Sequence, residues 1–258
     1  MALPVRYDLS GPSLKRERGR YSTLNDFLAF LSFDQPVFED DFWGDLFKGG
    51  AAPGIYQSTA SGAAAATAAI DTGTVNGQIK LDAGTDNNGR TDLSLGRHFR
   101  GDYNAVIAVR LRADVITTLK VEVGFTDVLS GTDAGAVNVK ATPTFTADDF
   151  VGWVLDTADN AYWEGLGVAA TVAGTTVEAA ISPTAATFET LVVALRDGNA
   201  KFLRFDADGG LTYESDWSAS MITATVLLTP WVFVQNRNAS GHIVNVDFIK
   251  VWQRRTSA

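Results

Sequence analysis

Two apolar runs joined by an Asp-Gly dipeptide decide the fold class: Thr190-Leu-Val-Val-Ala-Leu-Arg-Asp-Gly-Asn-Ala-Lys-Phe-Leu-Arg-Phe205. Thr190–Arg196 and Lys201–Phe205 are short and carry the β-branched and aromatic residues that strands favour. Asp197-Gly198 between them suits a tight turn whose residues adopt positive φ. The stretch therefore predicts an antiparallel β-hairpin.

The same pattern recurs along the chain from Pro36 onward. Short apolar runs alternate with polar positions and are interrupted by Gly, Asp and Asn. Further strands are expected at Val75–Leu81, Tyr103–Arg112, Leu119–Thr126, Gly152–Leu155, Thr175–Ile181, Leu227–Gln235 and His242–Gln253. Many short strands in series indicate a sandwich or a barrel. We predict an all-β, two-sheet antiparallel sandwich over residues 37–258.

Residues 1–36 are predicted to form an irregular N-terminal arm. Proline and glycine interrupt the first 20 residues, at Pro4, Gly11, Pro12 and Gly19. A short helix is expected at residues 22–32, because four apolar side chains recur there at helical spacing: Leu24, Phe27, Leu28 and Leu31. A disordered terminus is the alternative.

The arm is also predicted to attach the protein to an assembly. Its basic side chains Lys15, Arg16 and Arg18 contrast with the acidic remainder of the chain, and they would be attracted to an acidic neighbour. Its aromatic side chains Phe27, Phe30 and Phe33 require burial, either on the sandwich of the same chain or on a neighbour.

Composition excludes several classes of protein and site. The chain has 258 residues, a formal net charge of -9 and no cysteine, so disulfides and thiolate metal sites are absent. An acidic surface repels nucleic acid and anionic membranes, and no stretch approaches the roughly 20 apolar residues of a membrane span. The N-terminal residues lack the apolar segment of a secretion signal. We expect synthesis in the cytoplasm, with neither nucleic acid nor membrane as a partner.

Metal-binding residues are sparse. The two histidines, His98 and His242, are interpreted as polar surface residues. The loop Asp82–Asp92 offers several oxygen ligands, but it lacks two ligand positions of an EF-hand. We interpret it as a turn in which Asp and Asn bind their own backbone. No metal and no cofactor is predicted.

Catalytic residues are equally hard to find. Glu214-Ser-Asp216 begins the Glu-x-Asp-x-x-Glu pattern of sandwich-fold glucanases, but Ala219 stands in place of the third carboxylate. Neither an acid–base pair nor an activated nucleophile is evident. The sequence therefore predicts that the chain is not an enzyme.

Tryptophans are the remaining candidates for ligand contact, because an exposed indole can stack on a sugar ring whereas a buried one fills a core. Trp163 follows the polar Asp159-Asn160 and is expected on a loop. Trp163 and Trp217 are the predicted glycan-binding residues.

Several segments carry a resemblance to a known family. They are Phe38-Glu-Asp-Asp-Phe-Trp43, Gly124-Phe-Thr-Asp127, the hairpin segment from Phe188 to Phe205, Leu228-Thr-Pro-Trp-Val-Phe-Val-Gln-Asn-Arg237 and Val246-Asp-Phe-Ile-Lys-Val-Trp252. Together they resemble the concanavalin A-like jelly-roll modules of structural proteins in tailed bacteriophage virions. The resemblance spans about 215 residues and implies a last strand that pairs near the first.

Two roles follow from the resemblance. The first is a non-enzymatic structural protein of a phage virion, such as a capsid decoration or another head or tail accessory subunit. It would be attached through its arm to other copies of itself and to shell or tail proteins. The second is a carbohydrate-binding tail-tip or fibre module that recognises a host surface glycan.

Overall fold

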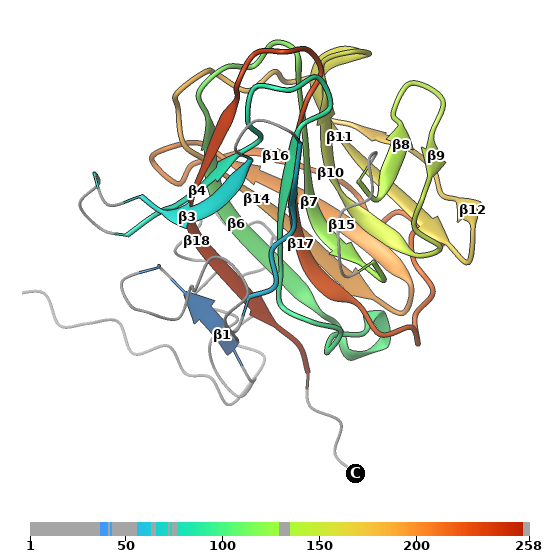
Figure 1. The fold of residues 1–258 in the computed structure, drawn as a ribbon. Helices are drawn as coiled ribbons and strands as arrows, with labels where there is room; N and C mark the ends of the chain where they lie inside the picture. The colour runs from blue at the N-terminus through green and yellow to red at the C-terminus, as the bar shows by residue number, and fades with distance from the viewer. Residues whose placement is uncertain are drawn as a thin grey trace, which may run out of the picture.

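The computed structural model describes residues 37–40, 42, 56–62, 66–71, 73, 77–128 and 135–254. Within these residues the chain forms two antiparallel eight-stranded sheets and one separate two-stranded hairpin (Figure 1). The only helical element described is η2, a 3-10 turn at Gly101–Tyr103. None of the described residues builds a helix long and apolar enough to cross a membrane.

The first sheet, here called sheet I, contains both the first and the last strand of the described chain. Its order is β16 (Leu211–Glu214), β15 (Asn199–Phe205), β14 (Glu189–Arg196), β6 (Val106–Ala113), β18 (Ile243–Trp252), β4 (Ile79–Asp82) and β3 (Thr67–Ile70), with β1 (Val37–Asp40) also paired to β18.

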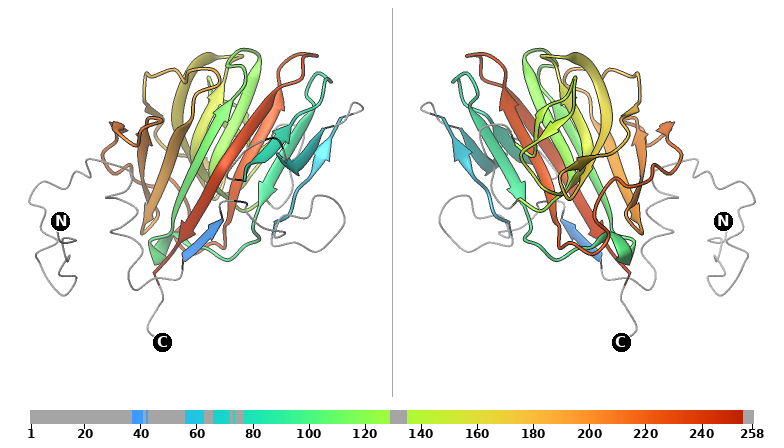
Figure 2. Two further views of the ribbon diagram at one scale, coloured as in Figure 1. Left: turned by 90° about the vertical axis from the view of Figure 1, so that its left-hand side faces the viewer. Right: turned by 90° about the vertical axis from the view of Figure 1, so that its right-hand side faces the viewer.

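The second sheet, sheet II, packs face to face on the first (Figure 2). Its order is β12 (Val172–Ala173), β11 (Asn160–Ala169), β10 (Phe150–Asp156), β7 (Leu119–Thr126), β17 (Thr229–Asn236), β5 (Arg90–Ser94) and β2 (Ala60–Ser61), with β13 (Val177–Glu178) also paired to β11. The separate hairpin consists of β8 (Val137–Val139) and β9 (Thr144–Phe145).

The all-β jelly-roll sandwich predicted from the sequence is confirmed. The Asp-Gly signal gives the β14–β15 hairpin, where Arg196 faces Asn199 across the turn. Asp197 and Gly198 have φ values of 49° and 80°, the positive values that such a tight turn requires. The predicted strand Leu119–Thr126 coincides with β7.

The main core lies between the two sheets, because alternate side chains of each strand point inward. In β7 the inward residues are Leu119, Val121, Val123 and Phe125, each 0% exposed. They pack in one cluster with the inward residues of sheet I, such as Ile107 and Val109 of β6.

Several predicted boundaries were wrong. The strand predicted at Tyr103–Arg112 begins only at Val106, because Asn104 takes a left-handed conformation at φ 51° and ends η2. The segment around Trp163, predicted as a loop, is the ten-residue strand β11. The predicted arm, its helix at 22–32 and its side chains Lys15, Arg16, Arg18, Phe27, Phe30 and Phe33 lie outside the described residues.

Candidate functional site

Trp163 is a core residue. It lies on β11 with 1% of its surface exposed, and its indole N–H donates to Glu189 Oε1 of β14 at 2.9 Å. Arg204 of β15 forms an ion pair with the same carboxylate. Burial raises the pKa of Glu189, while Arg204 and Trp163 act in the opposite direction. Trp163 therefore links the two sheets internally, and its ring has no exposed face for a sugar.

Trp217 lies at the surface, on the segment that follows β16. Ser218 and Ala200 exchange two backbone hydrogen bonds of 2.8 and 2.9 Å, so this segment continues along the edge of β15. Ser215 also binds β15, because its hydroxyl accepts a hydrogen bond from Phe202 N at 3.0 Å. Trp217 is thus held on an ordered edge with 38% of its surface exposed.

One charged side chain of sheet I contacts this indole, and two more form an ion pair on the adjoining strands. The Arg196 guanidinium lies 4.5 Å from the centre of the Trp217 ring, a distance typical of a cation–π contact. Lys201 and Glu214, on adjacent strands, form an ion pair of 2.5 Å. We call Arg196, Lys201, Glu214 and Trp217 the Trp217 corner. It combines an apolar ring with charged donors and an acceptor.

The outer face of sheet II is covered by the segment that contains β8 and β9. Lys120 and Glu122 project from β7 on this face, and both side chains are 0% exposed. Their charged groups are 2.8 Å apart. Lys120 Nζ also donates to the carbonyl of Val137, and Glu122 accepts from Val137 N at 3.0 Å. This buried ion pair fastens β8 to the sheet. Burial lowers the pKa of Lys120, although Glu122 acts in the opposite direction.

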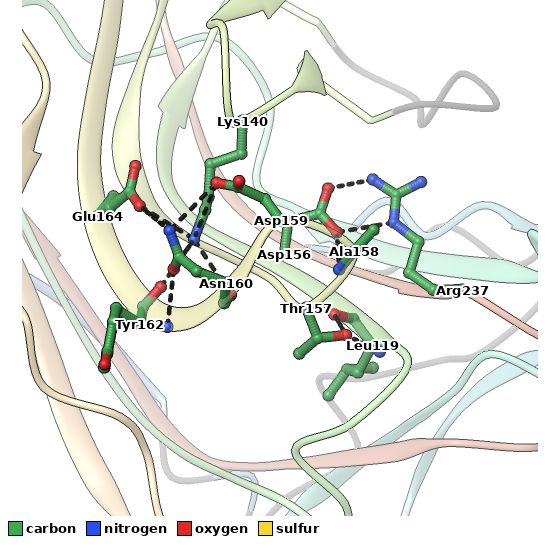
Figure 3. Close-up of polar contacts among 10 residues, drawn as sticks. All are labelled: Leu119, Lys140, Asp156, Thr157, Ala158, Asp159, Asn160, Tyr162, Glu164 and Arg237. Carbon is green, nitrogen blue, oxygen red and sulfur yellow. Dashed lines mark hydrogen bonds and ion pairs between the residues drawn. The ribbon is translucent and has the colours of Figure 1, made fainter.

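A second buried lysine fastens the same segment from the other side (Figure 3). Lys140, just after β8, donates to Asn160 Oδ1 at 2.7 Å and to the carbonyl of Tyr162 at 2.9 Å. Its Nζ is 3.2 Å from Glu164 Oε1 of β11. Nearby, Arg237 and Asp156 form an ion pair that is also drawn in the figure.

Sequence reasoning missed these charged groups. Glu122 and Glu164 both lie opposite Val154 of β10, so they are two strand spacings, about 10 Å, apart. Both carboxylates have internal partners and lie beneath the covering segment. Because Lys120 and Glu122 alternate with valines, the sequence predicts that the lysine and glutamate side chains face solvent. They are buried because the β8–β9 segment covers that face.

The other residues considered in the sequence occupy structural positions. His98 is exposed, whereas His242 is buried and contacts the Thr118 hydroxyl at 3.0 Å. Asp82 Oδ1 accepts a hydrogen bond from Gly84 N at 2.9 Å, as expected for a turn that binds its own backbone. Among the residues placed by the structure, no three or more His, Asp or Glu side chains gather as a metal site would require.

No protein-family model matches the sequence, and no curated protein matches it. Solved structures do show the same fold. A protein of unknown function from Shewanella oneidensis MR-1 superposes with a TM-score of 0.56 at 13% identity, over 93% of this chain and 99% of that one. Peanut lectin gives 0.58 at 10% identity, over 87% and 99%. The β-glucanase of Bacillus licheniformis gives 0.53 at 10% identity, over 85% and 98%.

These comparisons overturn the prediction that the chain is not an enzyme. That prediction rested on the missing third carboxylate after Asp216, yet a glucanase shares the fold over 85% of this chain. Glycoside hydrolases typically use two carboxylates. The structure places two on one face of sheet II, Glu122 and Glu164, but both are buried in ion pairs with lysine. A likeness at 10% identity shows the fold alone.

Proposed function

We propose that this chain binds carbohydrate and that the Trp217 corner is its glycan-contacting surface. The observation that carries the proposal is the exposed indole of Trp217 with the Arg196 guanidinium stacked on it, at the edge where β15 and β16 also carry an ion pair. The fold, which a lectin and a glucanase share, supports the same reading.

The chemistry of the corner matches that of a sugar. A pyranose ring has an apolar face of C–H groups, which can lie against an indole, and a rim of hydroxyls, which donate and accept hydrogen bonds. Arg196 and Lys201 supply donors at the rim, and Glu214 supplies an acceptor. Trp163, the other tryptophan predicted to bind glycan, has no part in this surface because it is buried.

A glycan array followed by titration calorimetry tests the proposal, with Trp217→Ala as the variant. Burying about 80 Å² of indole at about 25 cal/mol per Å² is worth about 2 kcal/mol, or about 30-fold in Kd. Tyr162→Ala is the matched control, because Tyr162 is an exposed aromatic residue, 45% exposed, outside the corner. The control should bind as the unmodified protein does.

Two results would overturn the proposal: no glycan bound by the unmodified protein, or equal binding by Trp217→Ala. Release of reducing ends, measured in the same samples, reports whether a bound glycan is also cleaved.

The virion role stays a prediction. None of the three structures named above is a virion protein by its description. A tail-tip or fibre protein that contacts a host glycan is one setting in which a Trp217 corner would act. Attachment to other copies and to shell or tail proteins is likewise untested.

A further inference from the structure

A lysine, a side-chain amide and a glutamate meet where the β8–β9 segment packs on β11 (Figure 3). Lys140 lies just after β8, and Asn160 and Glu164 belong to β11. Lys140 Nζ is 2.7 Å from Asn160 Oδ1 and 3.2 Å from Glu164 Oε1. Asn160 Nδ2 in turn donates to the same Glu164 oxygen at 2.7 Å. Each of the three side chains therefore contacts the other two.

The lysine of this triad is shielded from solvent. Its side chain is 0% exposed, and that of Glu164 is 7% exposed. The amine also donates to two backbone carbonyls, that of Tyr162 at 2.9 Å and that of Asn160 at 3.4 Å. A second carboxylate, Asp159 Oδ2, lies 4.0 Å from Nζ. Burial of this kind removes the water that would otherwise solvate the amine and compete with it for the amide.

Four contacts fix the orientation of the Asn160 amide. Its oxygen faces two donors, Lys140 Nζ and the backbone N–H of Tyr162, the latter at 3.0 Å. Its NH2 group faces two carboxylates, Glu164 at 2.7 Å and Asp159 at 3.1 Å. Because a C=O bond is about 1.2 Å long, Nζ lies within about 3.9 Å of the amide carbon. The amine is thus close to the separation of about 3–3.5 Å from which a nucleophile attacks.

We propose that Lys140 and Asn160 join in an intramolecular isopeptide bond, with Glu164 as the proton carrier. Lysine amines are nucleophiles toward carbonyl carbon once they have lost a proton. Glu164 accepts that proton from Nζ, and the nitrogen lone pair then forms a bond to Cγ of Asn160. The electrons of the C=O double bond move onto Oδ1, where the N–H of Tyr162 stabilises the negative charge.

Ammonia is the leaving group. Glu164 donates its proton to Nδ2 of Asn160, with which it is already in contact, and the Cγ–Nδ2 bond breaks as the C=O bond re-forms. The carboxylate then removes the second proton from Nζ and passes it to the departing ammonia. The products are one amide and one ammonium ion, so the step balances without an oxidant or another reactant.

The bond would tie the cover of sheet II to the sheet itself. The two linked residues are 20 positions apart in the chain, and they join the end of β8 to the start of β11. Such a ring restricts the unfolded chain as a disulfide does, in a sequence that has no cysteine. The Lys120–Glu122 pair holds the same segment by non-covalent contacts alone.

Peptide mapping of the unmodified full-length protein under denaturing conditions tests the proposal. Trypsin cleaves after lysine and arginine but not after an acylated lysine, and Lys140 is the only such residue between positions 120 and 196. The expected product is one peptide of residues 121–196, uncut at Lys140 and lighter than its sequence by the mass of one ammonia. Separate peptides 121–140 and 141–196 of unmodified mass would overturn the proposal.

Lys120 is the internal control of the same digest. It is as buried as Lys140, but its partners Glu122 and Val137 carry no side-chain amide that could release ammonia. Trypsin should therefore cleave after Lys120 completely. A loss of cleavage at both lysines would mean that incomplete unfolding, not a bond to Asn160, protects them, and it would count against the proposal.

Two variants test the part played by Glu164. Glu164→Gln keeps the size of the side chain but cannot carry the proton, so the linked peptide should form at least about 100-fold more slowly. Asp159→Asn is the matched control, because Asp159 also contacts the Asn160 amide but lies farther from Nζ, and it should link as the unmodified protein does. Equal linkage in Glu164→Gln would overturn the mechanism. The map of the unmodified protein decides whether the bond exists even if Glu164→Gln does not fold.

Discussion

Glu122→Gln tests the buried carboxylate that fastens β8 to sheet II. The carboxylate lies 2.8 Å from Lys120 Nζ and accepts from Ala136 N and Trp231 Nε1, each at 2.9 Å, and from Val137 N at 3.0 Å. Glutamine keeps the size but removes the negative charge, and its NH2 group replaces one of the two acceptor oxygens, so two of these four contacts are also lost. The Lys120 ammonium, 0% exposed, then has no countercharge beside it.

The expected loss of stability is about 3–5 kcal/mol, the usual cost of breaking a buried ion pair by removing one partner. At about 2–4 °C per kcal/mol for a chain of this size, Tm should fall by about 6–20 °C. Lys120→Met in the same background should recover part of the loss, because it removes the uncompensated charge but leaves the Val137 carbonyl without its lysine donor. Chemical denaturation of the two single variants and the double variant gives the coupling free energy.

The pH dependence provides an independent check. Burial lowers the pKa of Lys120 in the folded protein below the ordinary lysine value of 10.5, so the unfolded state binds more protons in the interval between the two values. The contribution of Lys120 to stability therefore increases as pH rises through the folded pKa. Removing the Glu122 charge lowers that pKa further, so the stability deficit of Glu122→Gln should shrink between neutral and alkaline pH. A loss below about 1 kcal/mol, or a deficit independent of pH, would refute this account of the pair.

Three further substitutions test the contacts that hold the two sheets and the β14–β15 turn in place. Trp163→Phe removes the indole donor to the buried Glu189 and should lower the free energy of unfolding by about 1–3 kcal/mol in urea titration. Gly124→Ala places a Cβ 2.1 Å from the carbonyl oxygen of Val151, so circular dichroism should show a large fall in Tm or no folded protein. Gly198→Ala forces a side chain onto φ +80° in the β14–β15 turn, and differential scanning calorimetry should report a loss of about 1–2 kcal/mol.

The β14–β15 hairpin and strand β7 could be predicted from the sequence because neighbouring residues alone specify them. Asp197-Gly198 favours one turn geometry, and Leu119–Thr126 alternates strictly in apolar and other residues. In both cases the inward face packs on the opposite sheet, which is the environment that the alternation implies.

Strand β11 could not be predicted in this way, because its pattern depends on distant partners. Gly165 and Gly167 occupy inward positions, where large side chains are expected, because the Phe202 ring and Met221 lie against them. Leu166 and Val168 point outward and are nevertheless apolar, because they pack in the cluster beneath the β8–β9 segment. From Gly165 to Val168, β11 thus has small residues on its inward face and apolar residues on its outward face, the reverse of the usual pattern. Without the usual pattern, the segment around Trp163 is predicted as a loop although it is a strand.

Which tryptophan is exposed could not be predicted, for the same reason. Trp163 and Trp217 cannot be distinguished by residue type or by their immediate neighbours in the sequence. Their difference arises from tertiary structure: β11 turns Trp163 toward Glu189, whereas the edge segment after β16 leaves Trp217 at the surface. Lys120 and Glu122 were missed because their alternation is that of an exposed face.

Part of each outer face of this sandwich is buried, which limits where a ligand can bind. On sheet II, Lys120 and Glu122 bind each other and the backbone of β8 under the β8–β9 segment. On sheet I, the outward residues Ala108, Val192 and Phe205 are apolar and buried. A ligand that needs both an apolar contact and charged hydrogen-bond partners finds neither buried region accessible. The large apolar residues exposed in the described parts of the chain are Val139, Tyr162, Val172, Trp217 and Leu227. Of the two aromatic residues in that set, Trp217 has a guanidinium stacked on its ring, and this arrangement makes the edge of β15 and β16 the place to look for glycan.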